Sequence, residues 1–143
     1  MEKNTDFYTL KGYQLNENIL ITYSMEDYLE MICRATKEND YVRITELAEM
    51  LHVKPSSASK MVSNLKIADL VDYQKYGYIK PTKKGLEYGK YLLYRHKTLN
   101  EFLCLVNNTE NETELVEKIE HYLDKRTVYN ISKLINQLKS DVL

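Results

Sequence analysis

One internal stretch limits the possible folds of this chain more than any other: ITELAEMLHVKPSSASKMVSNLKIADLV, at positions 44–71. Apolar residues recur at helical spacing before and after the segment 52–54, and Pro55 suits the first turn of a new helix. Two short helices joined by such a turn form a helix-turn-helix, whose second helix can enter the major groove of DNA. We therefore expect helices near 45–51 and 55–68.

The residues that follow predict a wing. The sequence LVDYQKYGYIKPT, at 70–82, alternates apolar and polar residues around a turn at 75–77, as a short hairpin does. Another helix is expected before the helix-turn-helix, at about 24–38, with Ser24 and Thr45 as the caps of the first two helices. Three helices and a two-stranded wing make a winged helix-turn-helix domain.

The second half of the chain has helical patterns. A long helix is expected at about 82–106, a short one at 115–123, and a last one at 128–138 with an apolar stripe at i, i+3, i+4 and i+7 spacing. Little chain remains to cover that stripe, so we expect it to pack on another subunit. The predicted fold is mainly α, with an N-terminal extension at 1–22, a winged helix-turn-helix DNA-binding domain at 23–90 and an α-helical dimerisation domain at 91–143.

Charge is segregated along the chain, although the net charge is only −1. Positions 43–97 carry eleven Lys and Arg against five acidic residues, and both flanks are acidic. A basic middle favours binding to DNA phosphates, whereas in a winged helix used for protein contacts these lysines would only be solvated. For DNA, the candidate phosphate contacts are Arg43, Lys60, Lys75, Lys80, Lys83 and Lys84, and the leading edge of the recognition helix offers Pro55, Ser56, Ser57 and Ser59.

Six residues of metal-ligand type lie on helices that can meet: Asp27, Glu30, His96, Glu117, Glu120 and His121. The first two stand three positions apart, and the last three stand at i, i+3 and i+4, so each set shares a helix face. Each pattern alone has an ordinary explanation, such as a capping acid or a solvated face. Brought together, however, the four carboxylates would repel one another and be partly protonated without a cation.

Divalent cations would remove that repulsion. The four carboxylates balance the charge of two M²⁺ ions, which suggests a binuclear centre bridged by Glu117 or Glu120. Carboxylate and imidazole donors without a thiolate suit Mn²⁺ better than soft ions, although Zn²⁺ or Cu²⁺ can bind such a site more tightly in vitro.

Composition excludes several classes of protein. The apolar content of 43% and the charged content of 29% are typical of a soluble globular protein, and no apolar run approaches the ~20 residues of a membrane span. The N-terminus lacks the features of a secretory signal, so we expect a cytoplasmic protein. Cys33 and Cys104 form no CxxC pair and are expected to be buried free thiols.

Four segments stand in order and at a spacing that a known family shares: SMEDYLEMI (24–32), VKPSSASKMVSNL (53–65), YGYIKPTKKGLEYGKYLLYRHKTL (76–99) and VEKIEHYL (116–123). They resemble the diphtheria toxin repressor family, in its manganese transport regulator branch. The resemblance implies a homodimeric, metal-activated repressor that binds a palindromic operator and represses manganese-uptake genes. It implies no enzymatic activity, no small-molecule substrate and no membrane partner.

The resemblance also places the manganese ligands of that branch on the same six candidates, between the DNA-binding and dimerisation domains. The iron-responsive branch tends to have Met where Asp27 stands and Cys where Glu117 stands, so manganese is favoured, with two Mn²⁺ ions per subunit. Binding of Fe²⁺, Zn²⁺, Co²⁺ or Cd²⁺ is expected in vitro. Asn100 stands where relatives often have a glutamate, which argues against an accessory metal site.

Three alternatives stay open. An iron- or zinc-responsive regulator of the same family would share the fold but respond to another metal. A metal-independent winged-helix regulator, gated by a small ligand, would bind its operator equally with and without a chelator. A di-metal carboxylate enzyme is disfavoured, because the sequence lacks Glu-x-x-His pairs on two helices and an evident nucleophile.

Overall fold

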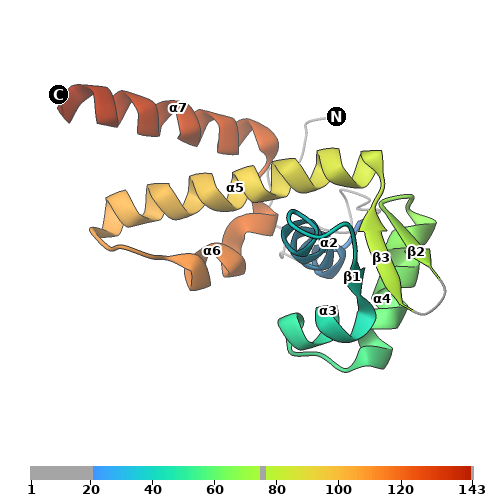
Figure 1. Ribbon diagram of the computed structural model, residues 1–143. Coiled ribbons are helices and arrows are strands. Elements are labelled where there is room, and N and C mark those ends of the chain that lie inside the picture. Colours follow the sequence, from blue (N-terminus) through green and yellow to red (C-terminus); the bar gives the residue numbers. More distant parts are fainter. Residues whose placement is uncertain (1–20, 75–76, 143) are drawn as a thin grey trace, which may run out of the picture.

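The computed structural model describes residues 21–74 and 77–142 (Figure 1). Residues 1–20 of the predicted extension, and residues 75 and 76 of the predicted turn, lie outside this range. In chain order the elements are α2 (Tyr23–Ala35), β1 (Val42–Arg43), α3 (Ile44–Leu51), α4 (Pro55–Ile67), β2 (Val71–Gln74), β3 (Tyr78–Pro81), α5 (Lys83–Asn107), α6 (Thr113–Ile119), the 3₁₀ helix η1 (Glu120–Tyr122) and α7 (Lys125–Val142).

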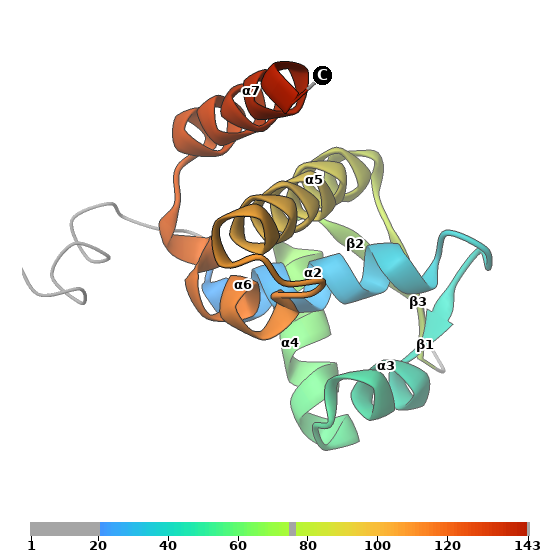
Figure 2. The same cartoon turned by 90° about the vertical axis from the view of Figure 1, so that its left-hand side faces the viewer.

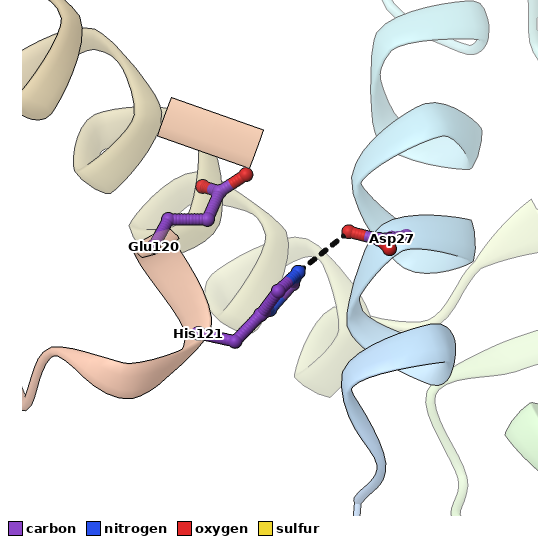
Figure 3. A group of neighbouring side chains, drawn as sticks. All are labelled: Asp27, Glu120 and His121. Atoms are coloured by element: carbon purple, nitrogen blue, oxygen red, sulfur yellow. Dashed lines mark ion pairs between the residues drawn. The ribbon is translucent and has the colours of Figure 1, made fainter. Parts of the chain in front are cut away.

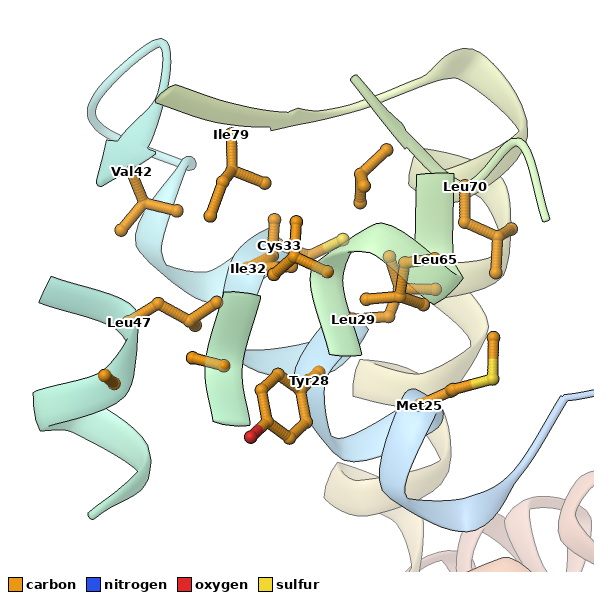
Figure 4. Close-up of a cluster of buried hydrophobic side chains, with 14 of the residues drawn as sticks. Met25, Tyr28, Leu29, Ile32, Cys33, Val42, Leu47, Leu65, Leu70 and Ile79 are labelled. Atoms are coloured by element: carbon orange, nitrogen blue, oxygen red, sulfur yellow. The ribbon is translucent and has the colours of Figure 1, made fainter. Parts of the chain in front are cut away.

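The N-terminal part is a winged helix-turn-helix, as predicted. Helices α2, α3 and α4 pack around one apolar core beneath the sheet, with Leu29 and Ile32 of α2 at its centre (Figure 4). The sheet has three antiparallel strands in the order β1-β3-β2, one strand more than predicted. The additional strand, β1, is only two residues long and pairs Val42 with Ile79, so it leaves little periodic signal in the sequence.

The caps of the first two helices differ from those predicted. The Oγ1 atom of Thr22, not Ser24, accepts a hydrogen bond from the backbone N–H of Met25 at 3.1 Å, so α2 begins at Tyr23. Helix α3 begins directly after β1 with Arg43 as its N-cap, and Thr45 is its second residue. The prediction for α4 is confirmed, because this helix begins at Pro55.

The long helix α5 is anchored to the DNA-binding domain. Its N-cap Thr82 accepts a hydrogen bond from the N–H of Gly85 at 3.0 Å and donates one to the carbonyl of Asp69 at 2.7 Å. A Cβ atom on Gly85 would lie 1.8 Å from the carbonyl oxygen of Leu70, so only glycine permits this approach. Positions 90 and 91, where the sequence analysis divides the chain, lie within this continuous helix.

Beyond α5, the chain turns back and ends in α7, which lies along α5 (Figure 2). The predicted apolar stripe of α7 is divided between two environments: Ile135 is buried within the chain, whereas Leu134 and Leu138 are each 42% exposed. Part of the stripe therefore packs on α5 rather than on another subunit. None of the helices within residues 21–74 and 77–142 is long and apolar enough to cross a membrane.

Candidate metal centre and nucleic-acid interface

Three elements that are distant in the sequence meet at one point: α2, the middle of α5, and η1. Asp27 of α2 and the pair Glu120 and His121 of η1 form a first group, whose ligand atoms all lie within 4.8 Å of one another (Figure 3). The Nε2 atom of His121 is 2.8 Å from Oδ1 of Asp27. This contact joins the DNA-binding domain directly to the C-terminal part.

A second group adjoins the first and shares one residue with it. Glu30 of α2, His96 of α5 and Glu120 of η1 offer ligand atoms that also lie within 4.8 Å of one another. The Nδ1 atom of His96 is 3.7 Å from Oε2 of Glu120. Glu120 belongs to both groups and is only 1% exposed. Five of the six predicted ligands thus belong to the two groups, and one of the five is the shared, buried carboxylate of Glu120.

The sixth predicted ligand, Glu117, is exposed on α6 and belongs to neither group in the described part of the chain. One helix was predicted at 115–123, with Glu117, Glu120 and His121 on the same face. The structure instead ends α6 at Ile119 and continues as η1. Ile119, between Glu117 and Glu120, has φ of −116°, far from the α-helical value, so the two residues do not belong to one regular helix.

Three side chains of the two groups have raised pKa values. Burial and the neighbouring carboxylate of Glu120 raise the pKa of Glu30, and contact with Glu120 raises the pKa of His96. Burial opposes the charged form of His121, but its contacts with Asp27 and Glu26 prevail and raise its pKa to about 9. A cation that binds His121 near neutral pH must therefore displace a proton from its imidazole.

Two buried imidazole nitrogens suit metal ligation. Among the described residues, Nδ1 of His96 and Nε2 of His121 have no hydrogen-bond partner, and the contact of Nε2 with Asp27, although short, does not have the angles of a hydrogen bond. Both nitrogens face carboxylates of the two groups. Oxygen and imidazole nitrogen donors, with no sulfur in either group, are a donor set that fits a divalent cation.

Two buried charged residues beside these groups, Glu26 and Arg95, were not predicted from the sequence. Glu26 is 8% exposed and Arg95 is 3% exposed, and they contact each other at 3.4 Å. A signal for Glu26 was available, because Glu26 and Glu30 are like charges at i, i+4 on one helix face, which is unfavourable without compensation. Burial of Glu26 itself could not be deduced from this local pattern.

Two aromatic side chains, those of Tyr23 and Tyr122, pack on one side of His121. The ring of Tyr23 stacks on the imidazole, with centroids 5.1 Å apart and planes inclined by 20°. Tyr122 meets Tyr23 edge-on, also at 5.1 Å. These two rings restrict rotation of the imidazole.

The predicted DNA-reading residues lie at the start of α4, where Pro55, Ser56, Ser57 and Lys60 are all exposed. Ser59 is different, because it is half-buried and its hydroxyl lies 3.1 Å from that of Tyr73 on β2. This bond ties the recognition helix to the wing. Ser59 is therefore better placed to orient the wing than to contact bases.

Two of the predicted phosphate contacts are engaged in the fold. Arg43 donates a hydrogen bond to the hydroxyl of Tyr78 at 3.1 Å and lies over its ring, and Lys84 donates to the carbonyl of Ala68 at 3.2 Å. Lys80 and Lys83 are exposed, and Lys75 lies outside the described residues.

Asn100, which stands where relatives often have a glutamate, has a structural role. Its Oδ1 atom accepts a hydrogen bond from the backbone N–H of Glu112 at 2.8 Å and faces the thiol of Cys104. The amide thus anchors the loop that leads into α6. Cys104 is only half-buried, whereas Cys33 is buried, and burial raises the pKa of the Cys33 thiol to about 11.

Comparison with known families agrees with this architecture. Residues 21–79 match the iron dependent repressor N-terminal DNA binding domain, and residues 82–142 match the iron dependent repressor metal binding and dimerisation domain. The chain belongs to the iron-dependent repressor family. It is accordingly a metal-dependent, DNA-binding transcriptional repressor with a dimerisation domain, and not an enzyme.

Individual relatives are similar over most of the chain. The HTH-type transcriptional regulator MntR of Oceanobacillus iheyensis is 41% identical over 121 residues, which are 84% of this chain and 82% of that protein. MntR of Bacillus subtilis is 38% identical over 123 residues, 85% of this chain and 87% of that protein.

Solved structures show the same fold. The manganese regulator SloR superimposes with a TM-score of 0.69 at 28% identity, and a manganese-dependent transcriptional repressor in complex with manganese superimposes with a TM-score of 0.72 at 27% identity. Each match covers 78% of this chain but only 53% and 52% of those longer chains. The chain thus spans about half the length of these two structures.

Proposed function

We propose that this protein is a Mn²⁺-dependent repressor of manganese-uptake genes, which binds a palindromic operator as a homodimer in the cytoplasm when manganese is plentiful. One observation carries the proposal: a buried carboxylate, Glu120, is shared by two groups of oxygen and nitrogen donors that join α2 to η1. The groups therefore lie between the part that binds DNA and the part that dimerises.

The coupling of metal to DNA is proposed to run through α2. Asp27 and Glu30 extend from one side of this helix toward Glu120 and His121, and the other side of α2 packs on the recognition helix α4 and on β3. A bound divalent cation would neutralise the carboxylates and hold the two domains together. A fixed α2 then fixes the recognition helix, and by reciprocity operator DNA should tighten metal binding by the same factor.

Manganese is favoured over other ions by the donors and by the relatives. The two groups contain carboxylates and imidazoles only, a set that suits Mn²⁺, although Zn²⁺, Fe²⁺, Co²⁺ and Cd²⁺ can also occupy such sites. Relatives at 38% to 41% identity are named MntR, and two similar structures are described as manganese regulators. Two groups that share one carboxylate support two ions per subunit.

The dimer is proposed to form through the exposed side of α7. Leu134 and Leu138 stand one helical turn apart on α7 and remain exposed in the single chain. Two recognition helices related by a two-fold axis would meet two half-sites about one DNA turn apart, which is the reason to expect a palindromic operator.

Fluorescence anisotropy with labelled operator DNA tests the proposal. Binding is measured in Mn²⁺, Fe²⁺, Zn²⁺, Co²⁺ and Cd²⁺, and in a chelator. We expect tight binding with Mn²⁺ and at least tenfold weaker binding in chelator. A response to Fe²⁺ or Zn²⁺ but not Mn²⁺ would assign another metal, and equal affinity in chelator would indicate a metal-independent regulator.

The third histidine supplies a matched control. His52 is exposed at the C-cap of α3, with φ of 56°, and takes part in neither donor group. Replacing His121 with Ala should abolish the response to metal. The variant His52→Asn should retain it, because asparagine tolerates this left-handed conformation.

A further inference from the structure

The carboxylate of Glu26 and the guanidinium of Arg95 form a buried pair beside the donor groups, yet neither belongs to them. Glu26 lies on α2 and Arg95 on α5, and Glu26 Oε1 is 3.4 Å from both NH1 and NH2 of Arg95. Tyr88, about two helical turns before Arg95 on α5, donates a hydrogen bond to the other oxygen of Glu26. Both oxygens of this carboxylate are therefore engaged inside the protein.

The same carboxylate holds one side of the His121 ring. Oε1 of Glu26 is 2.8 Å from Nδ1 of His121, and Nε2 on the opposite side of the ring points to Asp27 and lacks a hydrogen bond within the described residues. NH2 of Arg95 also lies near Nδ1, at 3.2 Å, but the contact with Glu26 is the shorter of the two and favours a proton on Nδ1. A proton on Nδ1 donated to Glu26 leaves the lone pair on Nε2. Carboxylates that accept from the outer nitrogen of a ligating imidazole set its tautomer and orientation in this way.

Arg95 extends the same support to the shared carboxylate. Its Nε atom is 3.4 Å from Oε1 of Glu120, while its terminal nitrogens contact Glu26. The second oxygen of Glu120 faces His96. One guanidinium thus occupies one oxygen of Glu120 and leaves the other directed into the second donor group.

We propose that Glu26 and Arg95 are positioning residues of the metal centre: Glu26 fixes His121 with Nε2 as the donor nitrogen, and Arg95 orients Glu120. The inference rests on the proposed function, because it concerns the same site. It adds two residues that touch ligands without being ligands. The pair of Glu26 and Arg95 also connects α2 to η1 through side-chain contacts, in addition to the contact between Asp27 and His121.

An ordinary buried ion pair would be the simpler explanation. Such a pair requires only that Glu26 and Arg95 face each other. Here both members also contact candidate ligands: Glu26 lies 2.8 Å from His121, and Arg95 lies 3.4 Å from Glu120 and 3.2 Å from Nδ1 of His121. The two explanations differ in what they predict for metal affinity when the fold is intact.

Metal affinity is measured by competition with a chromophoric chelator, using Mn²⁺ and Zn²⁺, for the full chain and for Glu26→Gln, Arg95→Lys and Tyr88→Phe. We expect Glu26→Gln and Arg95→Lys to weaken binding ~10- to 100-fold, the range for partners of ligating residues. Tyr88→Phe, which removes a partner of Glu26 that does not touch His121, is the control and should stay within about threefold of the unaltered chain. Thermal unfolding in chelator shows that each variant is folded.

An NMR measurement on the unaltered chain requires no variant. In the Zn²⁺-loaded protein, ¹⁵N correlation spectra should show His121 with its proton on Nδ1 and the metal on Nε2. The reverse assignment would overturn the inference, as would unchanged affinity in folded Glu26→Gln. If the unaltered chain binds neither Mn²⁺ nor Zn²⁺, the proposed function itself fails.

Discussion

The imidazole of His121 uses both of its nitrogens toward α2: Nδ1 lies 2.8 Å from Oε1 of Glu26, and Nε2 lies 2.8 Å from Oδ1 of Asp27. Two consecutive residues of one helix therefore hold one ring from opposite edges. Because α2 belongs to the DNA-binding domain and His121 to the C-terminal part, this ring links the two directly.

The pH dependence of stability follows from this ring. In the metal-free protein the pKa of His121 is about 9, above its usual 6.5. The ion pairs of the protonated ring thus contribute their full stability below pH 6.5, and this contribution is lost as pH rises through 9. Thermal unfolding in chelator should show a decline over this range that is smaller in His121→Gln. An identical pH profile in both proteins would contradict the assignment.

Metal binding should have the opposite pH dependence. A ligating imidazole must be neutral, so the ion has to displace the proton on Nε2 of His121, and the apparent affinity should rise from pH 6.5 to about 9. Calorimetric titrations at pH 7.5, in buffers of different ionisation enthalpy, should report proton release. Binding without any proton release would exclude His121 as a ligand.

Glu120 and Glu117 provide a direct test of the site. The variant Glu120→Gln alters both donor groups and should reduce metal-dependent operator affinity by at least the ~10- to 100-fold that is typical of losing an outer partner of a ligand. Glu117→Gln alters an exposed residue outside both groups and should have a much smaller effect. Equal losses in the two variants would show that α6 and η1 rearrange when metal binds. Operator anisotropy across a Mn²⁺ titration measures both.

Replacing Asp27 with Met changes the chemistry of one donor from a carboxylate to a thioether. Carboxylates suit Mn²⁺ and thioethers suit softer ions. Asp27→Met should therefore lower the affinity for Mn²⁺ more than that for Fe²⁺ or Zn²⁺. Unchanged operator affinity across all three ions would count against Asp27 as a ligand.

The packing of α5 against α2 can be tested at Gly89. A Cβ atom at this position would lie 2.2 Å from Sγ of Cys33, so Gly89→Ala should destabilise the protein by about 1–3 kcal/mol. The double variant Gly89→Ala with Cys33→Ala removes the clashing sulfur and should recover part of the loss. Urea unfolding measures the four proteins of this cycle. No recovery in the double variant would locate the clash elsewhere.

Dimerisation through the exposed side of α7 can be tested by introducing a charge there. Leu134→Glu places a carboxylate in the proposed interface and should shift the protein from dimer to monomer in light scattering after size exclusion. Asn136→Glu, on an exposed position of the same helix, is the matched control and should stay dimeric. A dimeric Leu134→Glu variant would place the interface on another surface.

Sequence patterns predicted the periodic elements of this fold well. The recognition helix, the wing and α5 all follow from apolar spacing together with Pro55 and Thr82. Helix ends were predicted less well, because Ser24 and Thr22 are both good caps and the packing of α2 decides between them. The predicted donor set depended on helices meeting in space, and five of its six members do so.

The residues that could not be predicted are those whose role depends on burial. Glu26 and Arg95 are ordinary surface types in a local pattern, and only the tertiary fold places them at 8% and 3% exposure. The change from α6 to η1 before Glu120 likewise has no clear sequence signal. Metal-ligand types are visible in a sequence, whereas the groups that hold them depend on contacts between distant segments.

Helix α5 begins directly after the wing and continues without interruption past the donor groups, so its two ends can move together as one rigid rod. Its 25 residues span about 37 Å at 1.5 Å per residue. His96 lies near its midpoint, so a tilt of about 10° at that point would move each end by roughly 3 Å. A displacement of that size is comparable to a hydrogen-bond length, so a small tilt of α5 at the donor groups would be felt at its N-terminal end, where the helix contacts β3 of the wing.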